Sequence, residues 1–193
     1  IHLAWVEEVL AGALEFDQRV FKAAKAIGPS LQVQLAEHQV TLRPDFALVD
    51  RSEQGNGLFI VSVVGPTVDL DETRLLDGYA ATPLEQMVSL LKGIGLPLGM
   101  VTNGERWCLV YAPEGKPVGY ASWYARLWFQ EPDTLRAFIS LLEMPRFFAG
   151  EDNSLLGLYE QSERHQDEVT EALGDQVARA VEVLIQALDR ADE

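Results

Sequence analysis

Residues 58–64 form a run that is apolar except for Ser62, and this run constrains the fold more than any other segment. A strand that is apolar on both faces must be covered on both faces, as happens in the middle of a sheet that carries helices on each side. Stretches with apolar residues at helical spacing lie before and after the run. The sequence therefore predicts an α/β fold in which a mixed, partly antiparallel sheet is flanked by helices.

The segments that precede this run supply a helix and several strands. Apolar residues at helical spacing predict a helix over residues 2–25, which Gly28-Pro29 would stop. Turn-forming residues 51–57 separate the apolar run from the preceding strand. Alternating or continuous apolar residues predict strands at residues 31–35, 40–42 and 46–49, the first two as a pair.

The sharpest local signal follows the run, at Thr82-Pro83-Leu84-Glu85. Threonine as N-cap, proline at the first helical position and glutamate three residues after the cap form a capping box. The predicted helix continues to about Lys92, where Gly93 and Gly95 end it.

The third part of the chain reads as a meander followed by a helix. Residues 96–102 and 106–111 are β-rich and are joined by Asn103-Gly104, a strong hairpin signal. A turn over residues 113–117 then predicts a third antiparallel strand at residues 118–124. Pro132 opens a short helix whose apolar face is Leu135, Phe138, Ile139 and Leu142.

The C-terminal part predicts a long amphipathic helix. Its apolar stripe steps by three or four residues through Val169, Leu173, Val177, Val181, Leu184 and Leu188. Residues 149–154 are polar and contain glycine, so they are interpreted as a linker. We expect an α/β domain over residues 1–148 and a helical connector over residues 149–193. Because the chain opens at Ile1 and its last helical pattern is uncapped, we expect it to be part of a longer protein.

Charge and composition limit the possible functions. The net charge is −15, and residues 151–193 hold −9 of it, so residues 1–150 are only mildly acidic at −6. This balance argues against an independent nucleic-acid binder, because duplex affinity comes largely from Lys and Arg at phosphates. The sequence offers poor material for a zinc site and no nucleophile–histidine pair, because it has one cysteine, Cys108, and three scattered histidines, His2, His38 and His165. No apolar run is long enough for a bilayer and no signal peptide opens the chain, so a cytoplasmic location without membrane contact is expected.

Several motifs together carry a family resemblance. Arg43-Pro44-Asp45 precedes the central apolar run, residues 101–107 hold a Thr-Asn-Gly hairpin, and Gln86 lies in the intervening helix. With the predicted order of helix, three strands, helix and two strands, this resembles the PD-(D/E)XK nuclease core of type I restriction subunits and type IIG-like enzymes. The resemblance covers roughly residues 1–112.

In that family, two carboxylates hold Mg²⁺ at the scissile phosphate and a lysine assists the attacking water. The resemblance places Asp45 at the first acid, but Ser62 at the second acid and Val64 at the lysine. It therefore implies a degenerate site, with no confident catalytic residue and with Gln86 as a further vestigial position. Asp45 is left either as a weak metal ligand, with Mg²⁺ needed only if cleavage survives, or as a structural residue. The acids that follow the strand, Asp69, Asp71 and Glu72, are the remaining source of a second ligand.

Other side chains have two open interpretations. Arg43 and Arg106 are candidates for contacts with DNA phosphates, although exposed arginines beside strands are mostly only solvated. An aromatic cluster is either a set of base-stacking platforms or core packing; it comprises Tyr120, Trp123, Tyr124, Trp128 and Phe129.

Residues 166–177 resemble the connector before the methylase domain in large adenine-specific restriction–modification methyltransferases. This implies downstream methylase and target-recognition domains as partners, with DNA bound through the full-length protein. S-adenosylmethionine is expected only in the downstream domain, because this chain lacks an Asn/Asp-Pro-Pro-Tyr/Phe motif. The predicted function is a vestigial, non-cleaving nuclease-like module of a restriction–modification or phage-defence methyltransferase, which positions DNA or docks other domains. The alternatives are an active Mg²⁺-dependent endonuclease domain and a pure protein-interaction scaffold.

Overall fold

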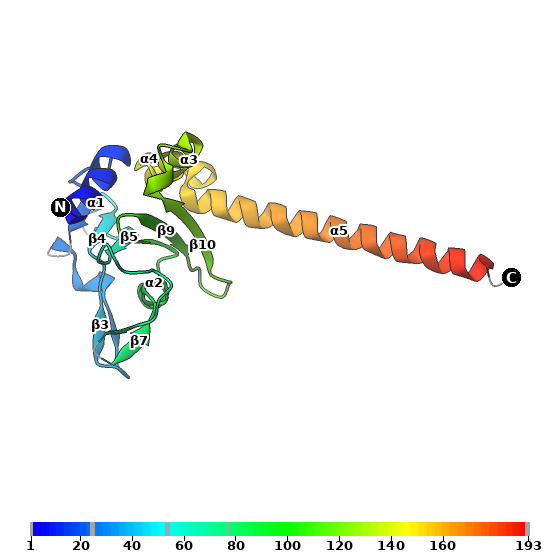
Figure 1. Ribbon diagram of the computed structural model, residues 1–193, viewed down its shortest axis with the longest axis horizontal. Coiled ribbons are helices and arrows are strands. Elements are labelled where there is room, and N and C mark those ends of the chain that lie inside the picture. Colours follow the sequence, from blue (N-terminus) through cyan, green and yellow to red (C-terminus); the bar gives the residue numbers. More distant parts are fainter. Residues whose placement is uncertain (1, 24–25, 53–54, 77, 192–193) are drawn as a thin grey trace. The chain divides into compact units, whose positions relative to one another are not determined.

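The computed structural model describes residues 2–23, 26–52, 55–76 and 78–191. The chain divides into two compact units, Ile1–Ala149 and Gly150–Glu193. The first is an α/β unit built on a mixed six-stranded sheet, as the sequence predicted, and the second is helical (Figure 1).

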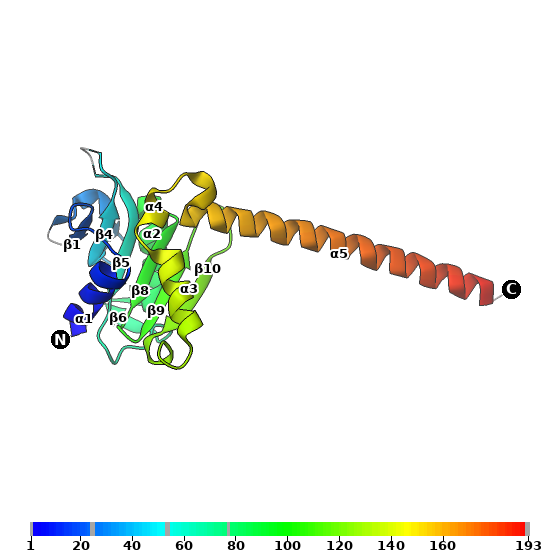
Figure 2. The same cartoon turned by 90° about the horizontal axis from the view of Figure 1, so that it is seen from above.

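The sheet of the α/β unit has the strand order β1-β4-β5-β8-β9-β10 (Figure 2). Strands β5 and β8 are parallel, whereas the other neighbouring strands of this sheet are antiparallel. The apolar run forms β5, which lies inside the sheet between β4 and β8, as predicted for a strand that is apolar on both faces. The strands are β1 (Phe21–Ala23), β4 (Phe46–Val49), β5 (Gly57–Val63), β8 (Leu98–Thr102), β9 (Arg106–Tyr111) and β10 (Gly119–Tyr124).

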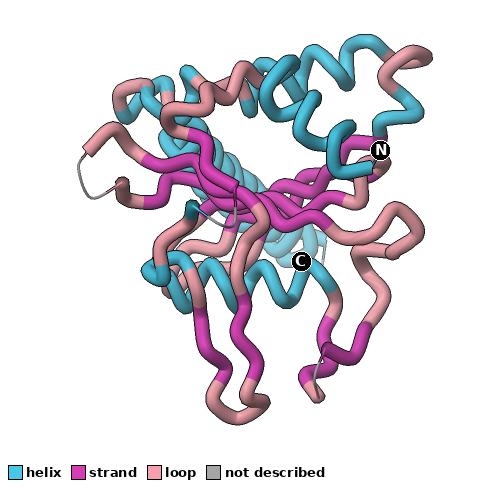
Figure 3. The backbone as a smooth tube through the Cα atoms, turned by 90° about the vertical axis from the view of Figure 1, so that its left-hand side faces the viewer, coloured by secondary structure: helices cyan, strands magenta, loops and turns pink. Residues whose placement is uncertain are grey.

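Helices cover both faces of this sheet. Helix α2 (Pro83–Ile94) lies on one face, and α1 (His2–Glu8), the π-helical turn η1 (Val9–Ala13), α3 (Pro132–Leu142) and α4 (Pro145–Phe148) lie on the other (Figure 3). The period-two alternation of β5 sorts its side chains between the two layers. Ile60 belongs to the aliphatic cluster under α2, and Phe59 packs on Phe147 of α4 with ring centroids 4.8 Å apart.

The capping box fixes the start of α2. The Thr82 side chain accepts a hydrogen bond from the Glu85 N–H at 3.1 Å, and the Glu85 carboxylate accepts one from the Thr82 N–H at 2.7 Å. The helix passes through Gly93 and ends at Ile94, and Gly95 forms the C-cap with φ +73°. The predicted helix, its start and its glycine stop are therefore confirmed.

The N-terminal prediction was wrong in its second half. The helix predicted over residues 2–25 ends with η1, and Phe21–Ala23 forms the edge strand β1. The helical path has ended before Glu15, which has φ +59°. Asp17 then forms the turn into β1, because its carboxylate accepts from the Arg19 N–H at 2.9 Å and its carbonyl accepts from the Val20 N–H at 3.0 Å. Helical spacing of Val20 and Phe21 was misleading, since Phe21 instead stacks on Phe46 of β4 at 5.1 Å. Lys25 lies outside the described residues.

Two hairpins project from the unit beyond α2 (Figure 3). The predicted strand pair is confirmed as β2 (Val33–Leu35) and β3 (Val40–Leu42), but it forms its own two-stranded sheet instead of joining the main one. The residues just before β2 form a short 3-10 turn, η3 (Pro29–Leu31). The second hairpin, β6 (Arg74–Leu76) with β7 (Tyr79–Ala81), was not predicted. Its strands are three residues long, too short for a clear alternation.

The remaining elements follow the meander and helix predictions. Strand β8 pairs with β9, and β9 pairs with β10, both in antiparallel orientation. After the 3-10 turn η4 (Ala125–Leu127), α3 buries Phe138 and Leu142 from its predicted apolar face.

The second unit consists of a 3-10 turn, η5 (Glu151–Asn153), and one helix, α5 (Leu155–Ala191). The helix begins at Leu155, well before the predicted stripe, and the Ser154 hydroxyl accepts from the Gly157 N–H at 3.0 Å in its first turn. Of the stripe, Leu173, Val177 and Val181 are 55%, 63% and 48% exposed. The side chains of Val169, Leu184 and Leu188 are outside the described part. Across the described residues, no helix combines the length and apolar character needed to span a lipid bilayer.

Candidate functional site

The sheet brings the predicted nuclease positions together at the beginning of β4. The antiparallel ladder pairs Phe46 with Val61, so Asp45 lies beside Ser62 where that ladder ends. The period of two then places Ser62 and Val64 on the same face as Ile60, which is the face covered by α2.

A small hollow lies between this end of the sheet and α2. Its volume is about 50 Å³, and the sequence-predicted residues Arg43, Ser62, Val64 and Gln86 all line it. The other lining residues are mostly apolar, and they include Leu42, Pro83, Met87, Leu90 and Val101. The hollow is far smaller than the roughly 300–1,000 Å³ of typical small-molecule sites.

Asp45 is engaged with the backbone of the neighbouring strand. Its carboxylate accepts a hydrogen bond from the Val63 N–H at 2.7 Å, and its own N–H donates to the Val61 carbonyl at 2.9 Å. Burial raises the pKa of Asp45, while the Val63 N–H and the charge of Arg43 act in the opposite direction. The carboxylate therefore occupies the place of a missing ladder acceptor for Val63.

Two of the acids that follow β5 have partners of their own. Asp71 forms an ion pair with Arg106, and Asp69 accepts a hydrogen bond from the Asp71 N–H at 3.0 Å. Among the described residues, no group of three or more His, Cys, Asp or Glu side chains is placed to hold a metal ion. Beside Asp45 the ladder places Ser62 and not a second acid, and a single carboxylate is a poor Mg²⁺ site.

The two candidate DNA-contact arginines differ in their surroundings. Arg106 is held on several sides: it pairs with Asp71, donates from Nε to the Ser122 hydroxyl at 3.2 Å, and lies 5.9 Å from the Tyr124 ring centroid. Arg43 is exposed at the rim of the hollow and forms no ion pair with the described residues. Arg43 is thus the more available of the two for an external anion.

The Thr-Asn-Gly turn has a structural role at the same end of the sheet. The Asn103 amide donates to the Val68 carbonyl at 2.8 Å, while its side-chain oxygen accepts from the Arg106 N–H at 2.7 Å. The Thr102 hydroxyl donates to the Arg106 carbonyl at 2.9 Å. These bonds fix the loop after β5 against the hairpin, so the motif shapes the candidate site without contributing a reactive group to it.

Sequence reasoning missed the contribution of α1 to this region. His2 Nε2 lies 2.9 Å from the Val64 carbonyl oxygen, and the Trp5 indole N–H donates to the Gly104 carbonyl at 2.9 Å. Gly104 has φ +83°, and a Cβ placed there would lie 2.7 Å from His2 Cε1. The Asn-Gly pair predicted the turn, but its contact with a helix about a hundred residues earlier has no local sequence signal.

The aromatic cluster divides into a buried and an exposed part. Trp128 is buried and its ring lies 5.1 Å from Phe138, and Trp123 lies 5.6 Å from the same ring. Phe129 is 96% exposed and Tyr120 is 52% exposed. Core packing therefore accounts for the two tryptophans and leaves base stacking as a prediction for Phe129 and Tyr120.

Comparison of the chain with protein-family models and with curated protein sequences found no match. What the site can do chemically therefore follows from its groups. One carboxylate with a raised pKa, one hydroxyl (Ser62) and one amide (Gln86) line or border a hollow too small for a nucleotide. This set offers hydrogen bonds and one exposed cation, but no paired acids to hold a catalytic metal.

Proposed function

We propose that the α/β unit is a vestigial nuclease-like module that positions DNA or docks other domains without cutting. One observation carries the proposal: Asp45, Ser62, Val64 and Gln86 meet at one end of the sheet, with a serine and a valine where cleavage needs an acid and a lysine. The Asp45 carboxylate already accepts a hydrogen bond from the backbone of β5, at the Val63 N–H.

The wider setting is part of the same proposal. It places the chain in the cytoplasm, within a DNA restriction–modification or phage-defence methyltransferase, next to methylase and target-recognition domains that bind DNA with it. S-adenosylmethionine would belong to the methylase domain. The support is the resemblance of residues 1–112 and 166–177 together with the site described above.

The first test is a plasmid-nicking assay with Mg²⁺ or Mn²⁺. The wild-type chain is expected to leave supercoiled plasmid intact, because Ser62 stands where a second carboxylate is needed to bind either metal beside Asp45. Nicking by the wild type that disappears in Asp45→Ala would favour the alternative, an active metal-dependent endonuclease.

The second test restores the missing groups. In the double variant Ser62→Glu, Val64→Lys, an acid would lie beside Asp45 and a lysine two residues further along β5, on the same face. We expect metal-dependent nicking above the wild-type background, and its loss when Asp45→Asn is added. A matched control, Val61→Glu, Val63→Lys, places the same groups on the opposite face. A folded Ser62→Glu, Val64→Lys protein that never nicks DNA would remove the support for nuclease ancestry.

A further inference from the structure

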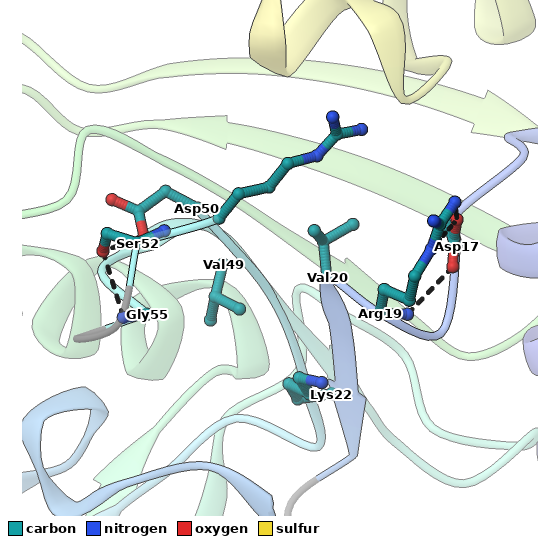
Figure 4. Close-up of a pocket in the computed structure, with 9 residues that line it drawn as sticks. Asp17, Arg19, Val20, Lys22, Val49, Asp50, Ser52 and Gly55 are labelled. Carbon is teal, nitrogen blue, oxygen red and sulfur yellow. Dashed lines mark hydrogen bonds and ion pairs between the residues drawn. The ribbon is translucent and has the colours of Figure 1, made fainter.

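We propose that the α/β unit carries a binding site for phosphate groups in a cleft at the far end of β4 from Asp45. The cleft has a volume of about 480 Å³, which is within the range of small-molecule sites. Its walls come from the turn before β1 and from the loop after β4 (Figure 4). Three cationic side chains line it, Arg19, Lys22 and Arg51, together with the carboxylates Asp17 and Asp50.

The two carboxylates are already satisfied by their own segments. Asp17 accepts from Arg19 Nε at 2.8 Å and from the Arg19 N–H at 2.9 Å, and these bonds lower the pKa of Asp17 to about 2. Asp50 accepts from the Ser52 hydroxyl at 2.5 Å and from the Asn56 side-chain amide at 3.0 Å, and its pKa is lowered by those bonds. Both acids therefore act as ionised anchors of their turns and have little capacity left for the other cations.

Lys22 and Arg51 are left without a carboxylate partner. Lys22 Nζ donates to the Gln18 carbonyl at a long 3.4 Å, and neither side chain forms an ion pair with the described residues. Besides the Arg19 hydrogen bonds, the Arg51 charge makes a smaller contribution to the lowered pKa of Asp17, which lies on the opposite wall of the cleft. Within the described part of the cleft, these two cations therefore have no carboxylate in contact.

Arg51 is also oriented for anion binding. Its guanidinium carbon lies 5.5 Å from the centroid of the Phe148 ring, a cation–π contact. A ring contact of this kind uses no N–H donor, so the guanidinium can still form paired hydrogen bonds with two oxygens of one anion. Val20 and Val49 lie between the two walls and add apolar surface to the cleft (Figure 4).

This combination favours phosphate over a simple halide or a single carboxylate. A phosphate offers several oxygens, so an ion in the cleft can accept paired hydrogen bonds from the Arg51 fork or a single one from the Lys22 ammonium. The same chemistry is found in a phosphorylated small molecule and in a nucleic-acid backbone. The inference does not depend on the proposed function, since it uses none of the residues around Asp45.

The test is titration calorimetry of the full chain with inorganic pyrophosphate, at an ionic strength kept constant with NaCl. We expect saturable binding, weakened about tenfold or more in Arg51→Gln and in Lys22→Gln, as for loss of a charge-assisted contact. Arg136→Gln is the matched control, because it removes the same charge from an exposed helix position that pairs with Asp133. No saturable binding by the wild type, or equal weakening in Arg136→Gln, would overturn the proposal.

Two further variants separate the site from a folding defect. Arg51→Lys keeps the charge but loses the fork, so we expect affinity between those of the wild type and Arg51→Gln. Phe148→Leu keeps every charge and removes the stacking surface, and it should also weaken binding. Unchanged affinity in both variants would contradict the oriented guanidinium on which the site is built.

A competition experiment then assigns the source of the phosphate. A short DNA duplex that displaces pyrophosphate from the wild type, and that binds more weakly to Arg51→Gln, would assign the site to a nucleic-acid backbone. Pyrophosphate binding that the duplex leaves unchanged would assign it to a phosphorylated small molecule. Neither result depends on nicking by the Ser62 and Val64 variants, so the two proposals can fail separately.

Discussion

Asp45 lies where the pairing of β4 with β5 ends, and the residue before it, Pro44, has no N–H of its own to give to a ladder. The side chain continues the pairing by accepting the Val63 N–H. A catalytic carboxylate would need free lone pairs directed at a metal. The Pro-Asp pair therefore ends the β4–β5 ladder, with the Asp45 side chain in place of the last backbone acceptor.

Replacing Asp45 separates its hydrogen bond from its charge. Asp45→Asn keeps an acceptor for Val63 and avoids burying an ionised group, so we expect stability at neutral pH equal to or above that of the wild type. Asp45→Ala leaves the Val63 N–H without its acceptor and should lower the unfolding free energy by about 1 kcal/mol. Urea denaturation monitored by circular dichroism measures both. A larger loss in Asp45→Asn than in Asp45→Ala would contradict this role.

The same carboxyl gives a pH dependence with a defined sign. Its pKa is raised in the folded state, so the folded protein binds the proton more tightly than the unfolded chain. Its contribution to the unfolding free energy therefore falls as pH rises from the ordinary aspartate pKa through the raised folded one. The stability difference between the wild type and Asp45→Asn should shift in favour of Asn over that interval. A difference that does not change with pH would show that Asp45 has no raised pKa.

Cys108 provides a third residue-scale prediction. The side chain is fully buried in β9 and burial raises the pKa of its thiol, so thiolate is scarce and shielded. In native buffer, a maleimide or dithionitrobenzoate reagent should react with it only as fast as the unit unfolds. Reaction within seconds at neutral pH, before any unfolding, would contradict the packing of this face.

Elements with strong local signals were predictable, and those fixed by distant contacts were not. The capping box gave α2 because its hydrogen bonds join residues three apart, and Asn103-Gly104 gave the β8–β9 hairpin for a similar reason. Strand β1 was missed because its evidence lies in β4, whose Phe46 stacks on Phe21. At the candidate site, Asp45, Ser62 and Gln86 were identified from the sequence. The hydrogen bonds from α1 to the carbonyls of Val64 and Gly104 were not predicted.

The contact between α1 and the hairpin can be tested at Gly104. Gly104→Ala adds the cost of φ +83° and a clash with the His2 ring, whereas Gly115→Ala adds a similar cost at φ +72° with nothing within 4 Å. We expect Gly115→Ala to cost about 1–2 kcal/mol, and Gly104→Ala to cost clearly more. Adding His2→Ala should recover part of the difference in chemical denaturation. Equal losses in the two glycine variants would show that α1 does not contact the turn.

The capping box makes a quantitative prediction for α2. Thr82→Ala removes the acceptor of the Glu85 N–H and should lower the unfolding free energy by about 0.5–2 kcal/mol. Thr82→Ser keeps the acceptor and should stay close to the wild type in thermal unfolding. A Thr82→Ser loss as large as that of Thr82→Ala would mean that packing of the threonine methyl, and not the cap, holds this end of the helix.

At the scale of the whole molecule, the two units differ in how they can be stable. The α/β unit has an extensive core, whereas the described part of the second unit is one helix after a short turn, and Leu173, Val177 and Val181 of its apolar stripe are exposed. Single helices in water are marginal without tertiary packing. The second unit must therefore obtain its stability from the first unit, from another copy or from another domain.

Shortening the chain to residues 1–149 tests this division. We expect the shortened protein to keep the β-sheet signal of the full chain, because the boundary lies between the two compact units. The full chain should gain helicity and mass in concentrated salt, which screens the −9 charge of residues 151–193 and permits self-association. Circular dichroism and light scattering give the comparison. Loss of the sheet in the shortened protein would show that α5 belongs to the core.

The parallel pairing of β5 with β8 also has a consequence for how the chain folds. Most other pairings in the main sheet join strands close in sequence, whereas this one joins Ile60 to Gly99 across the whole of α2 and a hairpin. Closing that loop has the largest entropic cost in the sheet, so β1-β4-β5 and β8-β9-β10 can form as two local blocks before they meet. Until they meet, each block exposes an unpaired inner edge, and such edges are templates for pairing with other chains. The speed with which α2 draws the blocks together therefore sets how long a newly made chain is open to aggregation.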